Sequence, residues 1–339
     1  MKHELKILVI GCGSIGERHI SNLQALNLAE ITVCDLNSER LNYIKDTYHV
    51  SSITDYEKAL GGADYNAVLV CSPTSEHIAP ALAAVRANCH VFIEKPLSHT
   101  LDGVDDLINE ARDRELVIMT GFNYRFHPGL RQVKRMLENN KIGRPFGARA
   151  HFGSYFLYRL PFHNMKDYRQ DYAANKTGGG VILDAATHLI DFLRWFFGEV
   201  EEIYCCAGKT GNLDLEVEDY AEMILRFRGG ITASVHADFV QQPAQNKLEI
   251  IGEGGTLAWS HTTGKLLLSA AVPGQWQEQW REVKVANKTA DMYLEEMKHL
   301  VKCLLGRATP ITDGIAGKRV LEIVLAAKDS AATGKTIRL

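Results

Sequence analysis

Short apolar runs alternate with helical stretches over about the first 120 residues of the chain. The run LKILVI at 5–10 is apolar at almost every position, which is typical of a strand buried on both faces of a parallel sheet. Similar runs follow at 31–35, 65–72, 90–96 and 116–122, and helices are expected up to about Leu26, from near Ser38, at 76–87 and at 101–114. Strands that alternate with helices predict a doubly wound parallel sheet with right-handed crossovers.

The alternation stops after about Tyr124. A helix is expected at 129–139 and a strand at 145–156, and from about residue 200 the strand-like runs follow one another closely. Gly229-Gly230 and Gly254-Gly255 separate these runs as hairpin turns would. This order predicts an α+β domain on a mainly antiparallel open sheet, with two helices, near 292–305 and 314–333, closing the chain.

Composition supports two globular domains. A single core rarely grows past roughly 250–300 residues, and this chain has 339, of which 46% are hydrophobic and 23% charged. We place the domains at 1–122 and 123–339.

The net charge of −3, with scattered Lys and Arg, offers no basic surface for nucleic acid or an anionic membrane. We read no signal peptide and no membrane-spanning run, and seven cysteines without a C-x-x-C pair favour free thiols in a reducing cytoplasm.

A glycine-rich turn follows the first expected strand and opens a helix. Its sequence is Gly11-Cys12-Gly13-Ser14-Ile15-Gly16. The pattern G-x-G-x-x-G also arises by chance, but its place between a strand and a helix is the one that dinucleotide binding requires. Gly11 would allow the tight turn, Gly13 the approach of a pyrophosphate, and Gly16 the packing of helix on strand. The N–H groups at the helix N-terminus would then bind the phosphates. A plain βα turn is the alternative.

Asp35 ends the second expected strand, 19 residues beyond Gly16. A carboxylate there would hold the hydroxyls of the adenosine ribose and repel a 2′-phosphate, so NAD is favoured over NADP. Arg40 could still reach such a phosphate. The alternative for Asp35 is that it only caps the following helix. Cys12, inside the glycine motif, is open to a redox role, although nothing else in the sequence supports one.

Two more polar stretches follow expected strands of the first domain. Ser72-Pro73-Thr74 comes after the run at 65–72, and Glu94-Lys95-Pro96 ends the run at 90–96. Ligands of such sheets bind at the carboxyl ends of the strands, which puts Lys95 near the expected nicotinamide. A lysine there could donate to a substrate oxygen. The alternative is a solvated lysine paired with Glu94.

The stretch GGGVILDAATHLID at 178–191 carries an aspartate and a histidine four residues apart. Asp184 and His188 would share one face of a helix. The pair could be catalytic, could bind a metal together with Asp191, or could be two polar residues on an amphipathic helix. Because no clustered Cys or His residues supply further ligands, we expect no metal.

Five stretches in order match the pattern of a known family: VIGCGSIGERH (9–19), VCSPTSEH (70–77), VFIEKPL (91–97), GFNYRFHP (121–128) and GGGVILDAATHLID (178–191). With them the chain resembles the glucose–fructose oxidoreductase, inositol dehydrogenase and rhizopine-catabolism family, known as Gfo/Idh/MocA. The resemblance covers essentially the whole chain. It implies a Rossmann domain followed by the α+β domain, and an NAD(P)-dependent oxidoreductase acting on sugars, sugar derivatives or inositols. It also implies a homodimer or homotetramer built through the face of the open sheet.

The resemblance assigns roles to single residues. Lys95 corresponds to the lysine of the family's Glu-Lys-Pro motif, and Asp184 and His188 to its Asp-x-x-x-His pair. His188 would take the hydroxyl proton while hydride passes to the nicotinamide, Asp184 would orient the imidazole or bind a substrate hydroxyl, and Lys95 would stabilise charge on the oxygen. The residues expected at the cofactor are Gly11, Gly13, Ser14, Ile15, Gly16, Asp35, Ser72, Pro73, Thr74, His77, Glu94, Lys95 and Arg125.

The segment at 152–176 is expected to line the substrate side. Its candidate substrate-binding residues are Tyr155, Arg159, His163, Tyr168 and Arg169. Aromatic rings suit the apolar faces of sugars and arginines suit anions, so an acidic or nucleotide-linked sugar is favoured over a neutral inositol. Any one of these residues could equally be a solvated loop residue. Two other functions stay open, a non-catalytic dinucleotide-binding regulator and an NAD-dependent glycosidase of the same fold.

Overall fold

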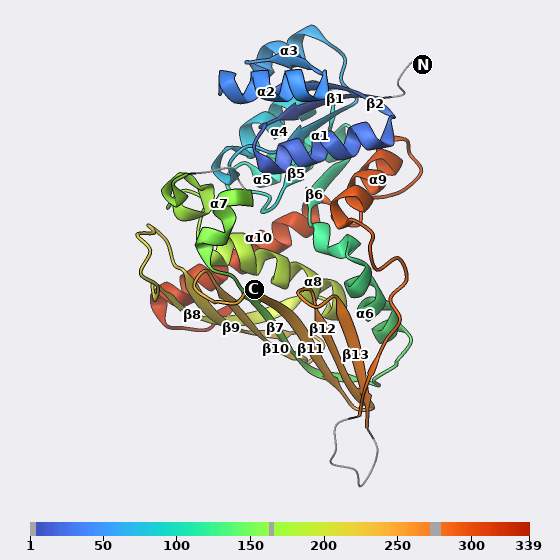
Figure 1. The fold of residues 1–339 in the computed structure, drawn as a ribbon, viewed down its shortest axis with the longest axis vertical. Helices are drawn as coiled ribbons and strands as arrows, with labels where there is room; N and C mark the ends of the chain where they lie inside the picture. Colours follow the sequence, from blue (N-terminus) through green and yellow to red (C-terminus); the bar gives the residue numbers. More distant parts are fainter. Residues whose placement is uncertain (1–4, 163–165, 272–278) are drawn as a thin grey trace. The chain divides into compact units, whose positions relative to one another are not determined.

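The computed structural model describes residues 5–162, 166–271 and 279–339. The chain forms two compact units (Figure 1). The first unit comprises Met1–Asn123, Pro161–Met165 and Tyr293–Leu321, and the second comprises Tyr124–Leu160, Lys166–Met292 and Glu322–Leu339. Residues from near the C-terminus therefore return to the first unit. No helix in the described ranges is both long and apolar enough to cross a lipid bilayer.

The first unit contains the predicted parallel sheet. Its strands have the order β3-β2-β1-β4-β5-β6, and each neighbouring pair is parallel. The elements are β1 (Leu5–Ile10), α1 (Ser14–Leu26), β2 (Ala29–Cys34), α2 (Ser38–Tyr48), β3 (Ser51–Ile53), α3 (Tyr56–Gly62), β4 (Ala67–Val70), a 3-10 turn (Thr74–Glu76), α4 (Ile78–Arg86), β5 (His90–Glu94), α5 (Val104–Asp113), β6 (Ile118–Gly121) and, near the end of the chain, α9 (Met292–Leu304). The doubly wound fold is confirmed.

Two elements of this unit have no counterpart in the sequence-based expectation. β3 has three residues, Ser51–Ile53, two of them serines, and none of them is buried. An edge strand of this kind carries no apolar run. α3 has seven residues and begins where the Asp55 side chain accepts hydrogen bonds from the N–H groups of Glu57 and Lys58. Both elements are too short for a recognisable hydrophobic period.

The second unit is built on a nine-stranded sheet of order β14-β13-β12-β11-β7-β10-β9-β8-β15. Its strands are β7 (Pro145–Gly153), β8 (Val200–Gly208), β9 (Tyr220–Phe227), β10 (Thr232–Asp238), β11 (Gln245–Gly252), β12 (Gly255–Ser260), β13 (Lys265–Ala270), β14 (Trp280–Glu282) and β15 (Ile337–Arg338). The predicted hairpins form at both glycine pairs, between β9 and β10 and between β11 and β12. Neighbouring strands are antiparallel, but β7 and β10 run parallel.

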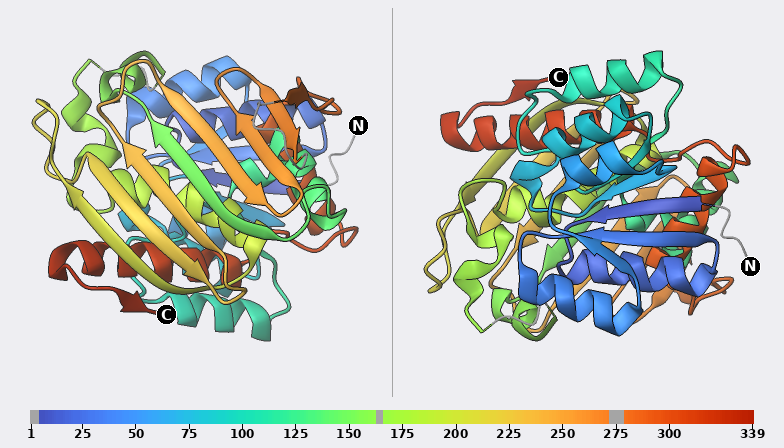
Figure 2. Two further views of the ribbon diagram at one scale, coloured as in Figure 1. Left: turned by 90° about the horizontal axis from the view of Figure 1, so that it is seen from below. Right: turned by 90° about the horizontal axis from the view of Figure 1, so that it is seen from above.

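The helices of this unit pack on one face of the sheet. They are α6 (Pro128–Glu138), α7 (Arg159–Phe162), a π-helical turn at Ile182–Ala186, α8 (Thr187–Phe197) and the second half of α10 (Gly314–Thr333), with short 3-10 turns at Asn123–Phe126, Phe156–Tyr158, Tyr168–Gln170 and Tyr172–Ala174. α6 packs on β12 and β13, and α8 on β7. β9 alternates strictly, with Ala221, Met223, Leu225 and Phe227 buried in the core. We call the opposite face of the sheet, which carries Tyr204 and Ile224, the open face (Figure 2, left).

Candidate active site

The turn between β1 and α1 depends on its glycines. Gly11 has a φ of +93°, and a Cβ there would lie 2.6 Å from backbone atoms of Cys71 and Ser72. A Cβ on Gly16 would clash with the carbonyl oxygen of Gly11. A Cβ on Gly13, in contrast, would meet no atom of the described residues within 4 Å. The turn is therefore closed by Gly11 and Gly16 and open at Gly13, next to the N-terminus of α1, which fits a bound pyrophosphate.

Asp35 lies beside this turn, directly after β2. Its Oδ2 accepts a hydrogen bond from the Cys12 N–H at 2.7 Å, and its Oδ1 accepts one from Asn37 N–H at 2.8 Å. Arg40 is paired with Glu17 and also donates to the Cys12 carbonyl oxygen. Burial raises the pKa of the Cys12 thiol to about 12, and the nearby Asp35 carboxylate adds to the effect. The thiol is therefore protonated at neutral pH, which argues against a redox role.

His77 connects the two loops that follow β4 and β5. Its Nε2 lies 2.9 Å from the Ser72 carbonyl oxygen and its Nδ1 lies 3.0 Å from that of Pro96. The ring is 1% exposed, and burial lowers the pKa of His77. His77 thus fixes the loop of Ser72, Pro73 and Thr74 against the loop that carries Lys95. Its polar atoms serve the protein backbone.

Glu94 holds the backbone of its neighbour Lys95. Its Oε2 accepts a hydrogen bond from the Lys95 N–H at 3.1 Å, and its Oε1 lies 2.6 Å from Nε2 of His19 on α1. His19 and Glu94 are both buried, whereas Lys95 is half-buried. His19 belongs to the stretch 9–19 that carried the family resemblance, but no role was expected for it. Only the tertiary contact with Glu94 identifies it as a support for the Lys95 loop.

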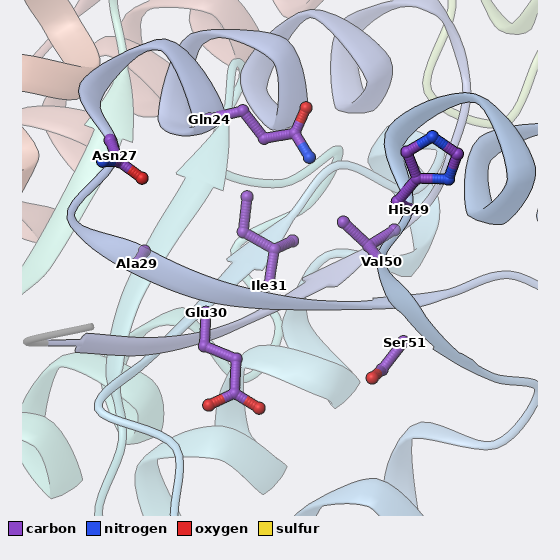
Figure 3. A pocket seen from close by; sticks show the side chains of 8 residues that line it. All are labelled: Gln24, Asn27, Ala29, Glu30, Ile31, His49, Val50 and Ser51. Atoms are coloured by element: carbon purple, nitrogen blue, oxygen red, sulfur yellow. The ribbon is translucent and has the colours of Figure 1, made fainter. Parts of the chain in front are cut away.

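The pocket drawn in Figure 3 lies at the amino ends of the parallel strands β2 and β3. It is lined by the end of α1 at Gln24 and Asn27, by the first residues of β2, and by Ser51 at the start of β3. The glycine turn, Asp35, Ser72 and Lys95 all follow the carboxyl ends of their strands. Since ligands of doubly wound sheets bind at carboxyl ends, this pocket is not the expected dinucleotide site.

In the second unit, Asp184 is the centre of a buried polar network. Its Oδ2 accepts a hydrogen bond from Nη1 of Arg159 at 2.7 Å, and its Oδ1 accepts one from the Tyr172 hydroxyl at 2.6 Å. The same guanidinium donates to both carboxylate oxygens of Asp171, at 2.9 and 3.2 Å. Asp171 and Tyr172 lie in an irregular segment, where no periodic pattern marked them as partners of Asp184.

Asp184 and His188 do not lie on one continuous α-helix. Asp184 is in the π-helical turn Ile182–Ala186, and His188 is in the first turn of α8. Single π-helical turns within α-helices are frequent at functional sites. His188 is half-buried, and its ring packs against Tyr124 with a centroid separation of 4.9 Å. The four-residue spacing between Asp184 and His188 thus spans a π-helical turn and the start of an α-helix.

Arg125 forms a buried ion pair with Asp191. Its Nε and Nη2 donate to the Asp191 carboxylate at 2.7–3.1 Å, and both side chains are almost fully buried. The carboxylates of Asp184 and Asp191 therefore each face a guanidinium. This pairing removes support for a metal site made of Asp184, His188 and Asp191.

The remaining candidate substrate residues have varied surroundings. Tyr155 packs edge-on against Tyr158, and the Tyr168 hydroxyl accepts a hydrogen bond from the Asp214 N–H. Arg169 is exposed and donates through Nε and Nη2 to Asp167. His163 lies outside the described residues.

Comparison with known proteins agrees with this architecture. Residues 5–122 match the family described as "Oxidoreductase family, NAD-binding Rossmann fold", and residues 130–258 match "GFO/IDH/MocA C-terminal domain". An inositol 2-dehydrogenase/D-chiro-inositol 3-dehydrogenase of Shouchella clausii is 30% identical over 265 residues, which cover 75% of this chain and 71% of the relative. The chain belongs to the Gfo/Idh/MocA family. The predicted NAD-binding Rossmann domain and the predicted NAD(P)-dependent oxidoreductase acting on sugar-type alcohols are thereby confirmed.

Two further known proteins align over nearly their full lengths. A myo-inositol 2-dehydrogenase of Thermotoga maritima is 28% identical over 347 residues, covering 99% of this chain and 98% of the relative. The fold matches a crystal structure of an oxidoreductase from Agrobacterium radiobacter in complex with NAD⁺, L-tartaric acid and magnesium. That match has a TM-score of 0.86 at 22% identity and covers 99% of this chain and 98% of the other.

Proposed function

We propose that this Gfo/Idh/MocA protein oxidises a secondary alcohol of a neutral sugar or inositol with NAD, and that Lys95, Asp184 and His188 carry the chemistry. The observation that supports these roles most directly is the pairing of Asp184 with Arg159 and Tyr172. A carboxylate that already accepts a guanidinium and a hydroxyl is a poor acceptor for a substrate proton. His188, four residues on, then remains as the general base of this stretch.

The three residues have separate tasks in this proposal. His188 takes the proton of the reacting hydroxyl, and bound NAD supplies the carbon that accepts the hydride. Asp184, held by Arg159, is a fixed negative charge that stabilises the imidazolium formed on His188. Lys95 donates a hydrogen bond to the reacting oxygen and stabilises its developing charge. Glu94 fixes the backbone from which Lys95 extends.

The preference for NAD rests on Asp35 and Arg40. Asp35 stands as a carboxylate beside the glycine turn, where it would accept the ribose hydroxyls and oppose a 2′-phosphate. Arg40, which could offset that charge, is paired with Glu17. NADP would need this ion pair to open.

A neutral substrate is supported by the partners of the two arginines that had suggested an anion. Arg159 is engaged by two aspartates, and Arg169 by Asp167. Neither guanidinium is left as an uncompensated charge for a carboxylate or phosphate of a substrate. The Thermotoga maritima relative, a myo-inositol 2-dehydrogenase, is consistent with a polyol substrate.

We also propose that the protein is a cytoplasmic homodimer or homotetramer. All seven cysteines lie in described residues and are free thiols, as expected in a reducing compartment. The apolar Tyr204 and Ile224, 42% and 47% exposed on the open face, suit a contact with a second copy. Analytical ultracentrifugation measures the assembly directly.

The test has two stages. A panel of inositols, neutral sugars, uronic acids and sugar nucleotides is screened with NAD and NADP by the absorbance of the reduced cofactor, and a neutral polyol with NAD is expected to react fastest. Lys95→Ala should then retain NADH binding while turnover falls by orders of magnitude. Lys58→Ala, which removes an exposed lysine paired with Asp55 in the same unit, is the control. Near-full turnover in Lys95→Ala would contradict the assignment.

A further inference from the structure

The open face of the second unit carries a cluster of potential metal ligands that takes no part in the proposed catalysis. β7 lies next to β10 in the sheet (Figure 2, left), and their parallel register sets His151 beside His236. Asp238 follows His236 at a spacing of two, so both side chains are on the same face of β10. We propose that His151, His236 and Asp238 bind Zn²⁺ or a closely related divalent transition-metal ion.

The geometry brings the three side chains together. One ligand atom from each lies within 4.8 Å of the others. The rings of His151 and His236 are stacked, with centroids 4.3 Å apart and an interplanar angle of 14°. Nε2 of His236 lies 2.6 Å from Oδ2 of Asp238. Two imidazole nitrogens and one carboxylate oxygen are thus gathered in one place. Because the lone pairs of stacked rings lie in parallel planes, at least one imidazole must rotate for both nitrogens to reach metal–ligand spacing.

Hydrogen bonds from outside the cluster orient the ligands. Nδ1 of His236 lies 2.7 Å from Oε1 of Glu222, which also accepts a hydrogen bond from the Tyr220 hydroxyl at 3.0 Å. With Nδ1 held by Glu222, His236 has its Nε2 directed at Asp238, where a metal ion would replace the shared proton. A histidine that donates its second nitrogen to a carboxylate is the usual arrangement around a protein-bound metal.

Asp238 is held in the same way. Its Oδ1 accepts hydrogen bonds from the N–H groups of Val240 and Gln241 at 2.8 and 2.6 Å, which turns Oδ2 toward His236. Asp238 is 2% exposed, so its charge is poorly hydrated and needs a positive partner.

A glycine on the neighbouring strand β7 leaves room for the side chains of Asp238 and Gln241. Gly153 is the register partner of Asp238, and a Cβ on Gly153 would clash with Asp238 and with the side-chain oxygen of Gln241. That oxygen lies 2.6 Å from Nε2 of His151. Gln241 therefore offers a neutral oxygen as a fourth ligand, with water as the other candidate for that position.

The ligand types select the ion. Mg²⁺ and Ca²⁺ prefer sites made of oxygen, whereas two imidazoles with one carboxylate suit Zn²⁺, Co²⁺ or Ni²⁺. In the absence of an ion, a proton between His236 and Asp238 supplies the positive charge. The hydrogen bond to Asp238 raises the pKa of His236, against the effect of burial and with help from Glu222. Metal and proton therefore compete, and zinc affinity should rise with pH.

Other titratable or charged groups lie near His236 and Asp238 in the register of the sheet, on the adjacent strands and on the strands next to those. They are Cys206 of β8, Tyr220 and Glu222 of β9, Arg149 and His151 of β7, and Lys247 of β11. Arg149 is paired with Glu249, and Lys247, the register partner of His151, is opposed by the carboxylates of Glu222 and Asp238 on either side of His236.

A second histidine pair in the same unit provides a contrast. Nε2 of His127 lies 3.2 Å from Nδ1 of His261, but no carboxylate among the described residues joins this pair in a metal-ligand cluster. Burial and the neighbouring His261 lower the pKa of His127 to about 4. The proposed site differs because carboxylates contact both ring nitrogens of His236 and raise its pKa.

The experiment uses the full-length protein freed of metal by chelation. Calorimetric titration should show one Zn²⁺ bound per chain and no comparable binding of Mg²⁺, and Co²⁺ should develop visible absorption bands of a nitrogen- and oxygen-ligated ion. Asp238→Asn keeps Oδ1 for the two backbone N–H groups, and His151→Phe keeps a ring stacked on His236. Each should weaken zinc binding at least 100-fold, and Glu222→Gln by about 10–100-fold.

Glu110→Gln is the control, because it removes a carboxylate paired with an arginine, Arg86, in the first unit and not on this sheet. It should leave zinc affinity unchanged. Thermal unfolding in chelator is measured for every variant, so that a folding defect is recognised independently of zinc. Absence of stoichiometric zinc binding by the wild-type protein would overturn the proposal. Zinc binding that persists unchanged in both Asp238→Asn and His151→Phe would place the ion elsewhere and overturn it as well.

Discussion

Replacement of Arg159 by Met should destabilise the second unit strongly, because it leaves two buried carboxylates without their cation. The Arg159 side chain is 21% exposed, and the side chains of Asp171 and Asp184 are 2% and 7% exposed. Removal of one partner from a buried ion pair costs about 3–5 kcal/mol, mostly through the uncompensated charge. We expect a loss in this range.

Arg169→Met is a matched control from the same segment. Arg169 also contacts an aspartate through Nε and Nη2, but its side chain is 61% exposed and that of Asp167 is 34% exposed. An exposed pair contributes about 0–1 kcal/mol. The two variants therefore remove the same residue type and a similar pairing geometry, and differ in burial.

The measurement is urea unfolding followed by tryptophan fluorescence. All four tryptophans fall between residues 195 and 280, so the signal reports on the second unit. The free energy of unfolding should fall by about 3–5 kcal/mol in Arg159→Met and by no more than about 1 kcal/mol in Arg169→Met. If the two losses agree within about 1 kcal/mol, near the usual scatter of mutational values, burial of the Arg159 network does not control its energetics.

Two further perturbations test the glycine turn and the histidine cluster. Gly11→Ala should lower the free energy of unfolding by about 2 kcal/mol or more, because alanine disfavours a φ of +93° and its Cβ would press on the Cys71–Ser72 backbone. Gly13→Ala should leave thermal stability unchanged and weaken NADH binding at least tenfold in a fluorescence titration; an equal loss of stability in both would show that Gly13 serves the fold alone. For His236, the hydrogen bond to Asp238 raises the pKa above the unfolded value. Its stabilisation is thus complete below about pH 6.5 and is lost as pH rises through the folded-state pKa. In chelator, the stability advantage of wild type over His236→Gln should therefore be largest below about pH 6.5 and shrink at higher pH, and an advantage that is constant or grows would contradict this account.

The parts of the fold that could be predicted are those encoded in short stretches. Each central strand of the first sheet is an apolar run, and Gly229-Gly230 and Gly254-Gly255 mark real hairpins. β3 could not be predicted, because a polar edge strand of three residues has the composition of a loop. The helix expected at 76–87 begins at Ile78, after a 3-10 turn, since pattern locates helix ends poorly.

The same division holds for the candidate site. The glycine motif was recognisable because all of its constraints lie within one turn. The partner of Asp184 was not, since Arg159 lies 25 residues away in a segment of short turns that has no period to follow. Arg159 was expected at the substrate because its charge was visible in the sequence and its two aspartates were not recognisable as neighbours. Whether a charged group is free or paired depends on the tertiary path of the chain.

The histidine cluster depends on topology even more. Strands that follow one another through hairpins predict that β10 lies beside β9 and β11, but β7 is inserted between β10 and β11 and runs parallel to β10. Only this insertion brings His151 beside His236.

Because the three ligands meet in the folded sheet alone, a bound ion must stabilise the second unit. Zinc at 100 times its dissociation constant should add about 2.7 kcal/mol to the free energy of unfolding of the wild-type protein. Asp238→Asn should gain nothing from the same zinc concentration, and an equal gain in that variant would mean that the ion binds without the cluster.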